Sequence, residues 1–76
     1  METLVHTGWC AVSGRDYQVL VFRRPDDRHV AKTWFTPRDV IVNDGSSLDE
    51  ALARHHRLLP LAVNSRELLR TARASS

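Results

Sequence analysis

The stretch that decides the fold runs from Ser47 to Pro60, SLDEALARHHRLLP. A serine followed three residues later by glutamate is a capping box, in which Ser47 accepts from the third helical amide and Glu50 reaches back to the helix start. Apolar residues and one histidine then recur at helical spacing, which predicts an amphipathic helix: Leu48, Ala51, Leu52, His55, Leu58 and Leu59. We expect the helix to end near Leu59, because proline disfavours helical geometry in the residue before it.

Downstream of Pro60 the sequence predicts a second, shorter helix. Asn64 and Glu67 have the spacing of another cap. The apolar residues that follow are Leu68, Leu69 and Ala72. We expect residues 71–76, which are small and polar, to form a frayed tail. A chain of 76 residues is long enough for one domain and not two, so a single domain is expected over residues 1–70.

Upstream of the capping box, three segments rich in β-branched and aromatic residues have the composition of strands: residues 3–12, 17–24 and 29–35. Gly14 can supply the positive φ of a tight hairpin between the first two, and Pro25 favours a turn between the second and third. The predicted fold class is therefore α+β, a three-stranded antiparallel meander followed by one amphipathic helix and a shorter C-terminal helix. Residues 40–42 are apolar and fit either a fourth strand or a buried turn.

The strand register sorts the side chains of the meander onto two faces. We assume a two-residue turn at residues 14–15 and a four-residue turn at residues 25–28. One face then collects Val5, Trp9, Ala11, Leu20, Phe22, Ala31 and Phe35, and the other collects Cys10, Val12, Tyr17, Val19, Val21, Val30 and Trp34. Both faces are apolar, whereas an antiparallel sheet with one solvated face alternates apolar and polar residues. One helix covers one face, so the second face needs the C-terminal helix, another subunit or a binding partner.

This surplus of apolar residues predicts a small non-catalytic interaction module. It would form a homo-oligomer or dock a protein partner through the second face, at Tyr17, Val19, Val21 and Trp34. The alternative is a nucleic-acid-binding module, with basic side chains placed beside the aromatic ones. Its candidate residues are Arg23, Lys32, Arg66 and Arg70. The net charge of only +2 favours the first prediction.

The three-strand-plus-helix order of residues 5–59 is similar in outline to the plant AP2-type and phage-integrase arm-binding DNA domains. The resemblance implies DNA recognition through arginines and aromatic residues on the strands. Here Arg23 and Arg24 point to opposite faces, and a long connection at residues 36–46 precedes the helix. No residue of the family's DNA-reading motif is therefore carried over.

Other function classes find little support in the sequence. The single cysteine, Cys10, excludes an internal disulfide and has no neighbouring base to activate it. His55 and His56 are adjacent, whereas helical metal pairs are spaced three or four residues apart, so we expect no metal site and no cofactor. We expect no catalytic residues and no enzymatic activity. No apolar run is long enough to span a bilayer and the N-terminus lacks signal-peptide features, so a cytoplasmic protein without membrane partners is expected.

Overall fold

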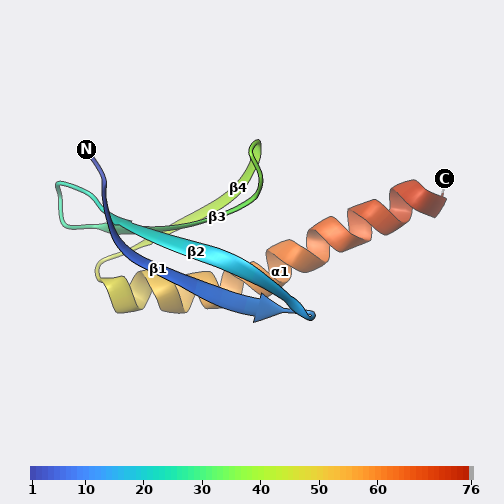
Figure 1. The fold of residues 1–76 in the computed structure, drawn as a ribbon, viewed down its shortest axis with the longest axis horizontal. Helices are drawn as coiled ribbons and strands as arrows, with labels where there is room; N and C mark the ends of the chain where they lie inside the picture. The colour runs from blue at the N-terminus through green and yellow to red at the C-terminus, as the bar shows by residue number, and fades with distance from the viewer. Residues whose placement is uncertain (76) are drawn as a thin grey trace.

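Residues 1–75 form a four-stranded antiparallel sheet followed by one long helix, as Figure 1 shows. The structure is a computed structural model that describes the backbone of residues 1–75 and the side chains of residues 1–71. The strands lie side by side in chain order. The elements are β1 (Thr3–Val12), β2 (Arg15–Arg23), β3 (His29–Thr36), β4 (Asp39–Gly45) and α1 (Leu48–Ser75).

The β1–β2 hairpin turns at Ser13 and Gly14, whose φ angles are 52° and 80°. Two successive positive φ values match the twist of the flanking strands. The turn lies one residue earlier than predicted and pairs Val12 with Arg15. Moving the turn by one residue changes which residues are paired but leaves each side chain on its predicted face. The predicted faces of β1 and β2 are therefore confirmed over this part of the hairpin: Cys10 is opposite Tyr17, and Trp9 is opposite Gln18.

The β2–β3 connection is one residue shorter than predicted, and this reverses the faces of β3. The Arg24 amide donates to the Arg28 carbonyl at 2.8 Å, so only three residues form the loop. Asp27, with φ of 64°, takes the left-handed position of such a loop. A one-residue change of register moves every side chain of a strand to the other face. Ala31 therefore lies opposite Val21, where the prediction had placed Lys32.

The apolar run at residues 40–42 belongs to a fourth strand, β4, which pairs with β3 along its length. The Thr36 hydroxyl accepts from the Arg38 amide at 3.2 Å in the turn between them. The predicted meander of three strands is thus one strand short. The extra strand also removes the outline likeness to the three-stranded DNA-binding domains, because β4 lies between the third strand and the helix.

The helix starts as predicted. The Ser47 hydroxyl accepts from the Glu50 amide at 3.1 Å, and the Glu50 carboxylate accepts from the Ser46 amide at 3.0 Å and from the Ser46 hydroxyl. The hydrogen bond from the Ser46 amide is the largest cause that holds the pKa of Glu50 below its usual range, and the Arg54 charge and the Ser46 hydroxyl lower it further. These hydrogen bonds cap the start of the helix from within the chain.

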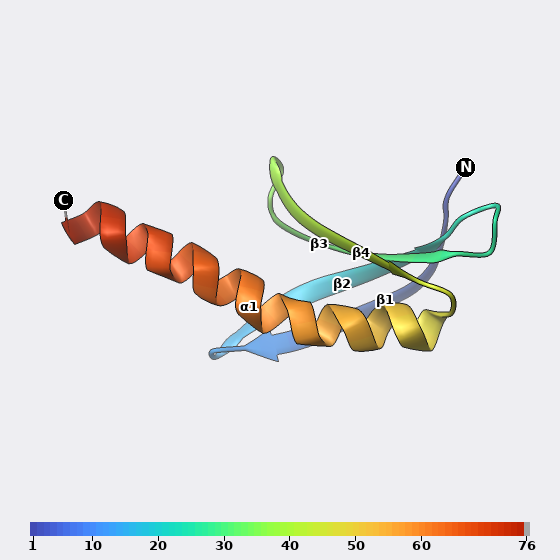
Figure 2. The ribbon, with the colours of Figure 1, turned by 180° about the vertical axis from the view of Figure 1, so that it is seen from behind.

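The prediction of two separate helices is wrong, because α1 runs through Pro60 to Ser75. Proline in a helix interior removes one hydrogen bond and its ring displaces the preceding turn, which bends the axis. In Figures 1 and 2 the helix changes direction part-way along, in its orange segment. The first half runs along the sheet, and the second half extends away from all four strands. No helix of the described residues is long and apolar enough to cross a membrane.

The core lies between the first half of α1 and one face of the sheet, called here the helix face. Val19, Val21, Ala31 and Ala51 form one buried cluster, and Val12, Leu59 and Val63 form another. The predicted helix stripe is confirmed at its buried positions Ala51, His55 and Leu59. At the end of β4, a Cβ atom on Gly45 would lie 2.6 Å from the Ala51 amide nitrogen, so only glycine allows the helix to approach here.

Candidate functional site

The sheet face opposite the helix, called here the open face, carries an apolar and aromatic surface. Side chains with this orientation alternate along each strand with those of the helix face. The members that are exposed or half-buried are Leu4, Trp9, Leu20, Phe22, Trp34, Val40 and Val42. Trp9 is 66% exposed and Trp34 is 45% exposed, although both are large apolar groups. No element of residues 1–75 covers this face, as Figures 1 and 2 show.

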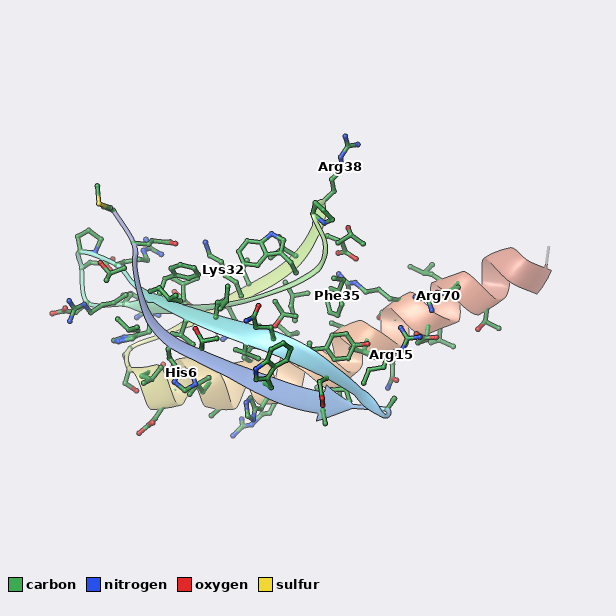
Figure 3. The ribbon with its side chains drawn as sticks, in the orientation of Figure 1. His6, Arg15, Lys32, Phe35, Arg38 and Arg70 are labelled. Atoms are coloured by element: carbon green, nitrogen blue, oxygen red, sulfur yellow. The ribbon has the colours of Figure 1, made fainter. Side chains whose placement is uncertain are left out.

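Lys32 lies at the centre of the open face. Its register partners are Leu20 on β2 and Val42 on β4. The Lys32 Nζ is 4.9 Å from the Phe22 ring centroid and 5.8 Å from that of Trp34. It also pairs with the Glu2 carboxylate at 3.0 Å. In Figure 3 Lys32 points away from α1, whereas His6 lies on the side of the sheet that α1 covers.

The structure places only one of the four predicted partner-binding residues on the open face. The placement of Val19 and Val21 there is wrong: they are 1% and 0% exposed and lie beneath α1. Tyr17 is also on the helix face, half-buried, with its ring 5.5 Å from that of Phe35 in an edge-to-face contact. Trp34 lies on the face opposite Tyr17, Val19 and Val21, because the shorter β2–β3 loop places each side chain of β3 on the other face from the one predicted.

The four predicted nucleic-acid contacts are not brought together. Arg66 and Arg70 lie on α1, Lys32 is on the open face, and Arg23 is exposed at the end of β2. Three of these cations form ion pairs within the chain: Lys32 with Glu2, Arg66 with Asp39, and Arg70 with Glu67. Arg66, which is held by two hydrogen bonds to Asp39, has the least to gain from a phosphate.

The pair of Arg66 and Asp39 joins the middle of α1 to the end of the sheet. The guanidinium donates two hydrogen bonds, at 2.7 and 2.6 Å, one to each carboxylate oxygen. This side-chain bonding holds the pKa of Asp39 below its usual range and raises the pKa of Arg66. The guanidinium carbon also lies 4.2 Å from the Phe35 ring centroid. Arg66 is therefore a structural clamp between helix and sheet.

A cleft of about 180 Å³ opens beside this clamp, where the sheet meets the second half of α1. Its charged lining residues are Arg15, Asp39, Arg66, Glu67 and Arg70. Figure 3 labels Arg15, from the start of β2, and Arg70, from α1. Because two of its three arginines are paired with carboxylates, the cleft is nearly balanced in charge. It is smaller than ordinary small-molecule pockets, which hold roughly 300–1,000 Å³, and the adjoining hollow of about 320 Å³ is more open and is lined by Asp39, Arg66, Leu69 and Arg70.

The groups best suited to chemistry are buried in a structural network. The His55 ring contacts the Thr33 hydroxyl at Nε2, at 2.7 Å, and the Asn43 amide oxygen at Nδ1. The Asn43 amide nitrogen donates to the Ala51 carbonyl, which orients its oxygen toward the ring. Nδ1 therefore carries the hydrogen. Thr33 and His55 are buried, so a substrate cannot reach them.

Burial lowers the pKa of His55 to about 4, with a smaller contribution from His56, so the ring is neutral at pH 7. Cys10 is half-buried on the helix face and packs against both core clusters. Among the described residues, no group of three histidine, cysteine or acidic side chains could hold a metal ion.

A second apolar surface lies on α1 and was missed in the sequence. Leu61 is 66% exposed and Leu68 is 70% exposed, and Leu58 and Leu69 are exposed beside them. The sequence places Leu58 in the buried stripe and Leu69 on the apolar side of a separate helix, whereas both are exposed on one helix. These four leucines lie on one side of the helix only if it continues through Pro60, so a prediction of one continuous helix would have identified this surface.

The chain matches no protein-family model, no curated protein and no solved structure. The two exposed apolar surfaces are therefore the features of the molecule that bear on its function.

Proposed function

We propose that this chain is a non-catalytic interaction module whose open face binds a protein partner with an apolar, carboxylate-bearing surface. The observation that carries the proposal is the position of α1. The helix covers one face of the sheet, and two tryptophans with several aliphatic side chains remain on the other. Such patches on soluble proteins mark interaction sites, and tryptophan is enriched among the residues that dominate binding energy.

The amount of exposed surface supports this proposal. The chain exposes 5314 Å². A compact monomer of its length exposes roughly 4,700 Å², so about 600 Å² is in excess. A standard interface buries roughly 800 Å² on each partner. This excess comprises both the uncovered open face and the projecting second half of α1.

Lys32 is the reason to expect a carboxylate on the partner. It is the one charged side chain among the central residues of the open face, and its partner Glu2 is an exposed residue that precedes β1. An ion pair with a solvent-exposed carboxylate contributes little to stability. A carboxylate on the partner would replace Glu2 while its apolar neighbours cover the rings of Phe22 and Trp34.

The test is selection of binders from a random-peptide library on the purified chain. We expect enriched peptides that combine aromatic or aliphatic residues with aspartate or glutamate. Trp34→Ala should weaken their binding by at least about 30-fold, because a central tryptophan anchor contributes roughly 2 kcal/mol or more. Trp34→Phe should recover part of the affinity.

Leu61→Ala is the matched control, since Leu61 is at least as exposed as Trp34 but lies on α1. It should leave peptide affinity unchanged. Peptides that bind Trp34→Ala as tightly as the original chain would contradict the proposal. So would single-stranded nucleic acid that binds the open face with an affinity that falls steeply with salt, which is the behaviour expected of phosphate contacts.

A further inference from the structure

We infer that the cleft beside the Arg66 clamp binds a small organic acid, through a carboxylate attached to an apolar body. The helix side of the cleft has a simple origin. Val63, Arg66, Glu67 and Arg70 follow one another at intervals of three, one and three residues, so they share one side of α1. Val63 is buried, whereas α1 beyond it leaves the sheet in Figures 1 and 2. The cleft of about 180 Å³ opens at this divergence, between α1 and the strand ends.

Arg15 brings an unpaired positive charge to this cleft. It is the first residue of β2, and among residues 1–71 no carboxylate forms an ion pair with it. The side chains of Arg23, Arg38 and Arg57 also lack an ion pair within these residues, but none of them lines the cleft or the adjoining hollow. Arg15 is therefore placed, as the other unpaired arginines are not, to bind an anion inside a cavity.

Arg70 lines the same cleft from the helix side. Its ion pair with Glu67 spans 3.3 Å between side chains that are 65% and 49% exposed. Such exposed pairs contribute little, so the guanidinium can turn to an incoming carboxylate at small cost. Arginine suits this task, because it donates two parallel hydrogen bonds to one carboxylate. Arg66 is committed elsewhere, since its guanidinium already donates to Asp39 and to the Ala62 carbonyl.

The other lining groups define the class of anion. Three arginines against the two carboxylates of Asp39 and Glu67 leave one positive charge in the cleft. This charge balances a monoanion, whereas the two carboxylates would repel a phosphate dianion. Tyr17 and Phe35 supply aromatic lining, and Leu69 extends the apolar surface into the adjoining hollow. The small volume suits a small acid better than a nucleotide.

The cleft is separate from the open face. Its lining residues Tyr17 and Phe35 lie on the helix face, and Figure 3 labels Phe35 together with Arg15 and Arg70. Binding of an acid here therefore does not depend on the proposed function, and loss of one activity leaves the other.

The first test is a titration of the isotope-labelled chain with benzoate, followed by NMR. We expect the Nε–H signals of Arg15 and Arg70 to shift with a dissociation constant on the order of 1 mM, because a small ligand in an open cleft binds weakly. Benzamide has the same shape without the charge and should bind at least about 10-fold more weakly. Acetate, which lacks the apolar body, should also bind more weakly. N-acetylphenylalanine mimics the carboxyl end of a peptide, so tighter binding than benzoate would make a peptide end the source of the carboxylate, and weaker binding a free acid.

The second test uses charge variants. Arg15→Gln should weaken benzoate binding by at least about 10-fold, while the NMR signals of the core stay in place. The matched control is Arg38→Gln, which makes the same change of net charge at a side chain that points away from α1 in Figure 3. It should bind benzoate like the original chain. Glu67→Gln releases Arg70 and removes a repelling carboxylate, so it should tighten binding about 3-fold.

Several results would overturn the inference. These are equal binding of benzamide and benzoate, unchanged benzoate affinity in Arg15→Gln, tighter binding of inorganic phosphate than of benzoate, or shifts confined to the open face around Trp34. The absence of any shift at a benzoate concentration about 10-fold above the expected dissociation constant would do the same. Trp34→Ala, which should weaken peptide binding on the open face, should leave benzoate binding unchanged.

Discussion

Replacing Leu59 by alanine should lower the free energy of unfolding by about 3 kcal/mol. Leu59 is completely buried and packs against Val12 and Val63, where α1 crosses the end of the β1–β2 hairpin. Leucine-to-alanine substitutions in a core cost roughly 2–5 kcal/mol, because the removed atoms lose their burial and leave a cavity. A domain of this length has roughly 4–11 kcal/mol of stability in total. The variant should thus lose a large part of its resistance to urea.

Urea denaturation followed by circular dichroism measures this effect. The matched control is Leu4→Ala, since Leu4 is half exposed on the open face. We expect its midpoint to lie close to that of the original chain. Similar losses in the two variants would contradict the assignment of the helix face as the core. The slope of free energy against urea should be unchanged in both, because the same surface is exposed on unfolding.

Lowering the pH from 7 to 4 should destabilise the chain by roughly 3 kcal/mol through His55 alone. The pKa of His55 is about 4 in the folded chain and about 6.5 in the unfolded chain, because burial disfavours the imidazolium. The unfolded chain therefore takes up a proton as the pH falls below 6.5, while the folded chain does not. The stability from the neutral ring is fully present above pH 6.5 and is lost progressively down to pH 4.

Urea midpoints at a series of pH values measure this dependence. His55→Gln removes the titrating ring, so its stability should be lower at pH 7 but nearly constant between pH 7 and 5. His56→Gln, the same substitution at the exposed neighbour, should keep the original dependence. The lowered pKa values of Asp39 and Glu50 add a further loss only below about pH 4.5, outside this window. A flat profile for the original chain between pH 7 and 5 would refute the buried neutral state of His55.

The sequence correctly predicted the features that a few neighbouring residues determine, namely the helix start and the first hairpin turn. Ser47 and Glu50 cap the helix where the capping box placed them, and Gly14 forms the first hairpin turn. One local signal was misleading and one was ambiguous. Pro60 does not end α1, because the Arg66 clamp and the buried Ala62 and Val63 hold the helix beyond it. The run at residues 40–42 was ambiguous, and pairing with β3 decides that it is a strand.

Which residues make up the candidate site depends on the register of β3, and neighbouring residues in the sequence do not determine that register. The sequence predicted a surplus of apolar side chains, and such a surplus remains on the sheet. Its members changed because a three-residue loop at Pro25 to Asp27 replaced the expected four residues. Trp34 thereby joined Trp9, Leu20 and Phe22, which we had placed under the helix. Pro-Asp-Asp sequences fit both loop lengths, so composition alone could not select the register.

Acrylamide quenching of tryptophan fluorescence, with and without a selected peptide, tests the open face most directly. The only tryptophans of the chain, Trp9 and Trp34, both lie on this face and both are exposed. Acrylamide should quench them efficiently in the free chain and much less when the peptide is bound. Tryptophans shielded from acrylamide in the free chain, or still fully accessible in the complex, would show that this face is not the docking surface.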